Sequence, residues 1–149
     1  MTVQQGLEPL VKTVVVPTTP ERAFEVFTAE MAAWWPLRTH SVGGDKATDV
    51  RVEGAVGGRI VEYDADGPVG YWGTVSDWDP PKTVSFTWHP GTDPKQAGHV
   101  TVTFRPVGDD TEVELTHTGW ERRPDGAEAR TEYDSGWTYV LDFYVNHHR

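Results

Sequence analysis

The spacing of apolar residues changes along this chain, and that change constrains the fold more than any other feature. Between Val50 and Thr118 apolar side chains recur at every second position, the period of a β-strand, and turn signals such as "DADGP" at 64–68 separate the runs. From Tyr133 to His148 aromatic and apolar residues recur instead at spacings of three or four. The pattern predicts a run of antiparallel strands followed by one long helix.

The first third of the chain adds one strand and two short helices. Residues 10–16 ("LVKTVVV") are rich in β-branched residues, which favour a strand. Thr18 or Thr19 can cap a helix that begins at Pro20, and this helix should end, or kink into a second short one, before Pro36. Grouped strands with helices at either end are typical of an α+β domain whose antiparallel sheet is covered on one face.

Three local features are open to more than one interpretation. The polar stretch 121–130 is expected to be a connection before the long helix. Gly136 lies within the periodic helical face, so it marks either a close approach of the backbone to another element or the helix start. Trp72 stands in a stretch that is apolar in both registers and that contains a glycine typical of a bulge, so the side to which its ring points stays open.

Composition limits the class of protein. A chain of 149 residues fits one domain over residues 1–149. The formal charge of −10 opposes binding to nucleic acid or to anionic lipid, and the absence of cysteine excludes disulfides and thiolate catalysis. The start of the chain lacks the features of a secretory signal, and no run of about 18 apolar residues could span a membrane. We therefore expect a soluble, cytoplasmic protein.

Several short motifs occur in an order that resembles a known family. They are "TTPERAFEVFT" at 18–28, "WWP" at 34–36, "GGR" at 57–59, "GTVSDWDPPKTVSFTW" at 73–88, "DDTEVELTHTGW" at 109–120 and "GW" at 136–137. Their order and spacing, from about Thr13 to Tyr144, resemble the START-like or SRPBCC superfamily and, within it, the branch similar to the C-terminal domain of the Hsp90 ATPase activator. The pattern is also similar to that of the calicheamicin self-sacrifice resistance protein.

The resemblance implies a helix-grip fold. In this fold a curved antiparallel sheet of about seven strands surrounds a long C-terminal helix, two short helices follow the first strand, and a cavity lies between sheet and helix. Members of the superfamily bind lipids, sterols, plant hormones or polyketides there, and some act as cyclases or self-protection proteins. Because one fold supports many functions, the resemblance predicts the fold and its cavity but not the ligand.

Candidate ligand-binding residues lie on faces that should converge on this cavity. They are Trp35, Trp72, Phe86, Trp88, His117, Tyr133, Trp137, Leu141 and Tyr144. Each can also be read as core packing. Trp34 and Trp35 would point about 100° apart on a helix, so one ring should close the core and the other should stand near the cavity; we assign Trp35 to the cavity. The hydroxyls of Tyr133 or Tyr144 could orient an apolar ligand.

His117 shares a strand face with Val113 and Leu115, so its side chain should point to the concave side of the sheet. It is either a polar anchor or general base in the cavity, or a histidine satisfied by its neighbours. The six histidines lie on separate segments or are adjacent to one another, which predicts no metal site, and no motif indicates a cofactor.

Three functions remain. The leading one is binding or sequestration of a hydrophobic, aromatic or polyketide-like small molecule by a monomer or homodimer. The second is a protein-interaction role in a stress response, with a chaperone as partner, as in the Hsp90 activator. The third is a cyclase or hydrolase that acts on a bound polyketide-like substrate with His117 as acid or base.

Overall fold

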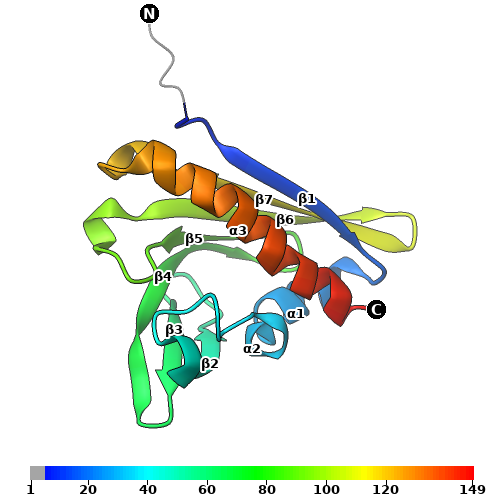
Figure 1. Cartoon of the computed structure of the whole chain (residues 1–149). Coiled ribbons are helices and arrows are strands. Elements are labelled where there is room, and N and C mark those ends of the chain that lie inside the picture. Colours follow the sequence, from blue (N-terminus) through cyan, green and yellow to red (C-terminus); the bar gives the residue numbers. More distant parts are fainter. Residues whose placement is uncertain (1–5) are drawn as a thin grey trace, which may run out of the picture.

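The computed structural model describes residues 6–149 and places seven strands in one antiparallel sheet (Figure 1). Residues 1–5, which belong to the start of the chain that argues against a secretory signal, lie outside the described residues. The strands follow the order β1-β7-β6-β5-β4-β3-β2 in the sheet. Their bounds are β1 Leu10–Val16, β2 Ala47–Val52, β3 Arg59–Asp64, β4 Gly67–Asp79, β5 Thr83–Trp88, β6 Gly98–Val107 and β7 Asp110–Thr118.

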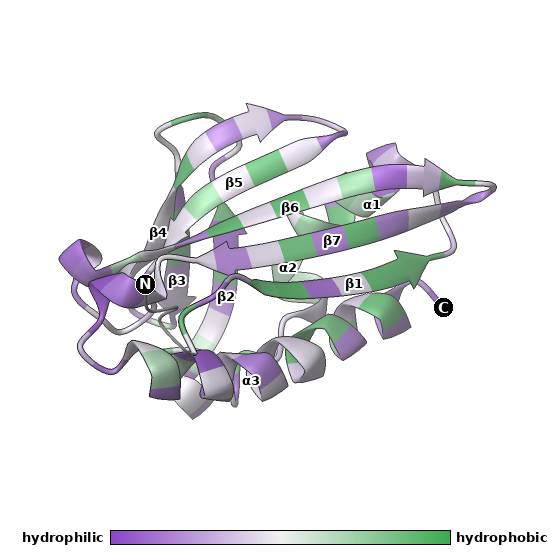
Figure 2. Cartoon of the chain, turned by 90° about the horizontal axis from the view of Figure 1, so that it is seen from above, coloured by the Kyte–Doolittle hydropathy of each residue, from purple (hydrophilic) through white to green (hydrophobic). Residues whose placement is uncertain are grey.

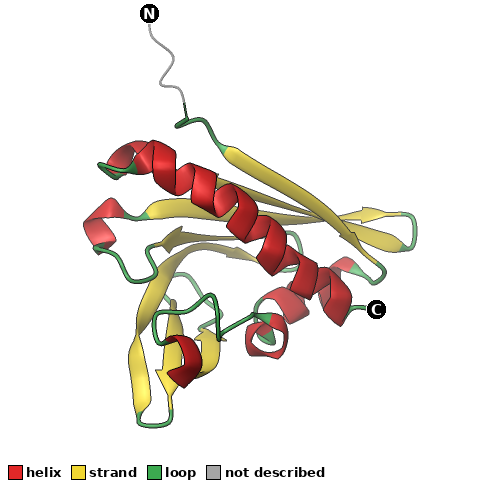
Figure 3. Cartoon of the chain, viewed as in Figure 1, coloured by secondary structure: helices red, strands yellow, loops and turns green. Residues whose placement is uncertain are grey.

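The helices gather on one side of this sheet (Figure 3). The α-helices are α1 Pro20–Phe27, α2 Met31–Trp34 and α3 Gly126–His147, and the short 3-10 helices are η1 Gly44–Lys46, η2 Pro94–Gln96 and η3 Trp120–Arg122. Thr19 caps α1, because its hydroxyl accepts a hydrogen bond of 3.2 Å from the backbone N–H of Arg22. The curved sheet, the long C-terminal helix and the two short helices confirm the expected helix-grip architecture.

The core lies between α3 and the inward face of the strands. Val102 pairs with Leu115 and Phe104 with Val113 across β6 and β7, and all four side chains are buried. Figure 2 shows this alternation as changing bands of hydropathy along the strands, with α3 beside them. Burial of these alternate positions against α3 fixes the register, since a slip by one residue would turn every apolar side chain to solvent.

The sheet curls because β4 is bent. Its pairing shifts register against both neighbours, near Ile60 on β3 and between Val75 and Asp77 on β4. At Gly73 a Cβ atom would lie 1.7 Å from the carbonyl oxygen of Thr87, so only glycine allows the approach of β4 to β5 there. In Figure 1, β2, β3 and the first part of β4 turn away from the rest of the sheet. Trp72, whose orientation the sequence left open, faces inward and is 1% exposed.

The expected start of the long helix is wrong. The helix α3 begins at Gly126, inside the stretch 121–130 that was expected to be a connection. At Gly126 a Cβ atom would lie 2.2 Å from the carbonyl oxygen of Trp120, and Ala129 is buried. Small residues thus pack this first turn against η3, and small residues carry little of the apolar signal on which the prediction rested.

Gly136 meets neither expectation, because it lies in the middle of α3 and a Cβ atom built on it would touch nothing within 4 Å. Nothing in the structure requires glycine at this position. None of the helices within residues 6–149 is both long enough and apolar enough to cross a membrane.

Candidate functional site

The adjacent tryptophans separate at the end of α2. Trp34 is the last residue of the helix, and its indole N–H donates to the carbonyl of Val26 at 2.8 Å inside the core. Trp35 has left the helix with an extended backbone, and its indole N–H donates to the carbonyl of His40 at 2.6 Å. Its ring lies 5.2 Å from that of Trp72. Trp35 therefore connects the core to the loop that follows α2.

A cavity of about 400 Å³ opens beside Trp35. It lies between the loop after α2, the loop after β5 and the first half of α3. Its lining residues are Trp35, Thr39, His40, Ser41, Val42, Trp72, Trp88, Pro90, Gly91 and Tyr133. We call this the indole cavity, because three tryptophans, Trp35, Trp72 and Trp88, are among its lining residues.

The indole rings at this cavity pack against one another, and the phenol of Tyr133 belongs to a further lining residue. The ring centroids of Trp72 and Trp88 lie 5.7 Å apart, and Trp137 packs 5.4 Å behind Trp88. The indole nitrogen of Trp88 is buried, and no group within residues 6–149 forms a well-aligned hydrogen bond with it. Burial raises the pKa of the Tyr133 phenol, and the neighbouring Trp88 N–H opposes part of that rise. Tyr133 therefore stays protonated at neutral pH and can donate a hydrogen bond at the cavity wall.

His117 lies behind the wall of the indole cavity and does not line it. Its Nδ1 atom accepts a hydrogen bond of 3.0 Å from the indole N–H of Trp137, and its ring lies 4.0 Å from that of Trp120. Burial, helped by the charges of Arg123 and His99, lowers the pKa of His117 to about 3. The imidazole is therefore neutral, carries its proton on Nε2 and orients Trp137.

The other candidate residues form the layer beneath the cavity. The ring of Phe86 packs 5.6 Å from Trp88, and Leu141 is 2% exposed. The Tyr144 hydroxyl lies in the core, where it donates to the carbonyl of Ala23 at 2.8 Å. Burial raises the pKa of this hydroxyl. The structure thus brings Trp35, Trp72, Trp88 and Tyr133 to the cavity, while Phe86, His117, Trp137, Leu141 and Tyr144 lie outside its lining.

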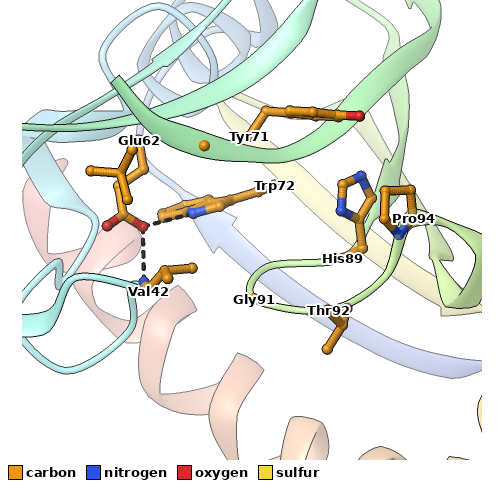
Figure 4. A pocket seen from close by; sticks show the side chains of 10 residues that line it. Val42, Glu62, Tyr71, Trp72, His89, Gly91, Thr92 and Pro94 are labelled. Atoms are coloured by element: carbon orange, nitrogen blue, oxygen red, sulfur yellow. Dashed lines mark hydrogen bonds between the residues drawn. The ribbon is translucent and has the colours of Figure 1, made fainter. Parts of the chain in front are cut away.

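One residue that holds this site together was missed by the sequence analysis. Glu62 on β3 is 0% exposed and accepts three hydrogen bonds, of which Figure 4 draws the two from Val42 and Trp72. Its Oε1 atom accepts from the backbone N–H of Val42 at 2.8 Å and from the indole N–H of Trp72 at 2.9 Å, and its Oε2 atom accepts from the N–H of Gly43 at 2.7 Å. The signal was present, since Glu62 follows the inward-facing Ile60 by two residues. A carboxylate on an inward register position must find buried donors.

A second, smaller chamber lies beyond Trp72 (Figure 4). It measures about 290 Å³ and is lined by Val42, Glu62, Val69, Gly70, Tyr71, Trp72, His89, Gly91, Thr92 and Pro94. His89 closes one side: its backbone N–H donates to the carbonyl of Trp72 at 2.6 Å, and burial lowers the pKa of its imidazole. Val42 and Gly91 line both chambers, and a Cβ atom on Gly91 would lie 3.6 Å from Val42. Trp72 also lines both chambers, so these three residues lie where the two chambers adjoin.

Within residues 6–149, no three histidine or acidic side chains come close enough together to hold a metal ion. The chemistry of the site comes from aromatic rings and a few hydrogen-bonding groups.

Comparisons with known proteins give a consistent family. Residues 17–144 match the family model described as "Activator of Hsp90 ATPase homolog 1-like protein". Among solved structures, the anthrahydroquino-gamma-pyrone synthase Txn09, complexed with SUM, is 33% identical over 93% of this chain and 95% of its own, with a TM-score of 0.61. The self-sacrificing resistance protein CalC from Micromonospora echinospora is 25% identical over 95% and 94% of the two chains, with a TM-score of 0.66.

A third solved structure shares the fold at lower identity. The Aha1 dimer from Colwellia psychrerythraea is 17% identical over 95% of this chain and 96% of its own, with a TM-score of 0.70. A comparison with curated protein sequences gives no match.

Proposed function

Because the chain belongs to the Activator of Hsp90 ATPase homolog 1-like family of the START-like superfamily, we propose that it binds a hydrophobic, aromatic small molecule in the indole cavity. The observation that carries the proposal is the lining itself. Three tryptophans and one tyrosine line a space of about 400 Å³, within the range of about 300–1,000 Å³ usual for ligand sites.

The shape and polarity of the cavity favour a planar ligand with few polar groups. Aromatic walls gain most from another aromatic ring, which can stack on them or meet them edge-on. The Tyr133 hydroxyl and the His40 imidazole add hydrogen-bonding groups at the lining, whereas the hydroxyls of Thr39 and Ser41 already form hydrogen bonds within their own loop. A polycyclic phenol or quinone of polyketide type, with an apolar body and a few oxygens at its edge, matches this arrangement.

The relatives support this ligand class. The synthase Txn09 is named for an anthrahydroquino-gamma-pyrone, a fused aromatic compound, and it is 33% identical over nearly the whole chain. CalC, at 25% identity, is described as a self-sacrificing resistance protein. From the name of Txn09 we take the class of ligand, and experiment must identify the compound that this chain binds.

A second candidate function is ring closure on such a bound molecule, which the identity to the synthase favours. Acid–base groups at the lining are His40 and Tyr133. Burial lowers the pKa of His40, and its Nδ1 atom is hydrogen-bonded to the Thr39 hydroxyl at 2.9 Å, so a proton from a ligand would go to its Nε2 atom. His117 is a poorer candidate than the sequence suggested, because Trp137 already occupies its Nδ1 lone pair.

Binding can be tested with 1,8-dihydroxyanthraquinone as the probe and quenching of tryptophan fluorescence as the measurement. We expect saturable binding to the wild-type protein and about fivefold weaker binding to Tyr133→Phe, since one hydrogen bond contributes about 1 kcal/mol. The matched control is Tyr63→Phe, because Tyr63 lies on β3 outside both chambers and should keep its affinity within about twofold.

Two results would contradict the proposal: no saturable quenching up to the solubility limit of the probe, or equal losses in Tyr133→Phe and Tyr63→Phe. Ring closure needs a probe with an open chain, such as an ortho-hydroxyaryl 1,3-diketone, which closes to a γ-pyrone with loss of water. Loss of water in the wild-type protein that stops in His40→Ala, followed by mass spectrometry, supports catalysis, whereas an unchanged mass of the diketone contradicts it.

A further inference from the structure

Apart from the two chambers described so far, another apolar cavity lies between α1, the end of β2 and the turn that joins β4 to β5. It measures about 540 Å³ and shares no lining residue with the indole cavity or the smaller chamber. Its lining residues are Glu21, Phe24, Glu25, Thr28, Ala29, Val52, Gly54, Trp78, Pro80 and Pro81. Nothing in the proposed function uses this cavity.

Trp78 forms an ordered aromatic surface in this cavity. Its ring is half-buried, and Phe24 meets it edge-on with ring centroids 5.0 Å apart and planes at 72°. On another side the backbone comes so close that a Cβ atom on Gly54 would lie 2.8 Å from the six-membered ring of Trp78. Helix α1 and the segment after β2 therefore fix the ring, and an ordered ring loses little entropy when a ligand packs on it.

The charges at the cavity are negative. Glu21 and Glu25 lie one turn apart on α1 and both line the cavity, while no lysine or arginine does. Arg22 neutralises part of this charge, because it forms ion pairs with Glu25 and Glu30. Glu21 takes part in no ion pair with any residue among 6–149. The cavity thus combines an indole surface with a carboxylate that has no cationic partner in the described chain.

We propose that this cavity is a second binding site that takes a hydrophobic organic cation, an amine or quaternary ammonium compound with an apolar body. The apolar body packs on Trp78 and Phe24, and the cation lies beside Glu21. Tryptophan is the best aromatic partner for a cation, and the net charge of −10 favours the approach of positive ligands. The indole cavity differs, since no acidic residue lines it. This second site does not depend on the function proposed above.

The test compares two probes with the same ring and opposite charge, 1-naphthylmethylammonium and 1-naphthylacetate. Binding is followed by chemical shifts in ¹⁵N-labelled protein. We expect the cation to shift the Trp78 indole signal and the amides of Thr28 and Ala29, and to bind at least tenfold more tightly than the anion. Glu21→Gln should weaken binding of the cation about fivefold, which corresponds to about 1 kcal/mol for one exposed charge.

Two further variants make the result decisive. Trp78→Leu should weaken binding of the cation more than tenfold, as measured from the chemical shifts of the Thr28 and Ala29 amides. Glu114 is an exposed carboxylate on β7, so Glu114→Gln should leave the affinity for the cation unchanged. Equal affinities for the two probes, or equal affinities of the wild-type and Glu21→Gln proteins, would overturn the proposal. So would shifts confined to the indoles of Trp35, Trp72 and Trp88, which would place the probe in the indole cavity.

Discussion

Replacing Glu62 by glutamine is expected to lower the free energy of unfolding by about 3 kcal/mol. The carboxylate is fully buried and accepts from Val42, Gly43 and Trp72. A glutamine offers only one accepting oxygen, so its amide N–H₂ must face a donor that Glu62 now satisfies. A buried donor without a partner costs about 1–3 kcal/mol, and the loss of charge weakens the two remaining bonds. Chemical denaturation measures the change, and the midpoint of thermal unfolding should fall by about 10 °C.

The matched control for this substitution is Glu114→Gln. Glu114 is an exposed carboxylate on β7, so the same chemical change should alter stability by less than about 0.5 kcal/mol. Equal stability of the Glu62→Gln and Glu114→Gln proteins would show that the three hydrogen bonds contribute nothing net. The Glu62→Gln protein should also lose order in the loop after α2, because Val42 and Gly43 are held by this carboxylate.

The strands and helices were predictable because their signals are local. Alternation along β5, β6 and β7 and the helical spacing after Tyr133 each depend on a few neighbouring residues, and all of these elements are found. The start of α3 was not predictable from apolar spacing, because glycine and alanine pack its first turn. Helix geometry also separated Trp34 from Trp35, although the structure adds that the helix ends between them.

The cavity was harder to predict, because loops from distant parts of the sequence form it. Thr39, His40 and Ser41 come from one loop and Pro90 and Gly91 from another, and no periodic pattern places such loops beside each other. Glu62 gave a different kind of signal, because it is a charged residue at an inward position of β3, and its carboxylate fixes the loop after α2. A buried charge on a strand face is a signal for the position of a loop as well as for chemistry.

Lowering the pH from 7.5 to 5 is expected to destabilise the wild-type protein by about 2 kcal/mol more than it destabilises His117→Gln. The pKa of His117 is about 3 in the folded protein and has its ordinary value of 6.5 in the unfolded chain. Above pH 6.5 both states are neutral, and the contribution to stability is fully present. As the pH falls from 6.5 towards 3, only the unfolded chain takes up the proton, so stability is lost. Denaturation curves at several pH values measure the difference.

The choice of glutamine keeps the comparison specific, because its side-chain oxygen can still accept the hydrogen bond from Trp137. Val113→Ala is the control: it opens a cavity on the same strand face and lowers stability, yet adds and removes no titrating group, so its pH profile should run parallel to that of the wild type. A parallel profile for His117→Gln as well would contradict the burial argument. If Nδ1 of His117 is protonated, it can no longer accept the hydrogen bond from the Trp137 N–H. Acid should therefore weaken the attachment of the Trp137 ring, which packs against Trp35 and Trp88. The wall of the indole cavity thus depends on a histidine that stays neutral.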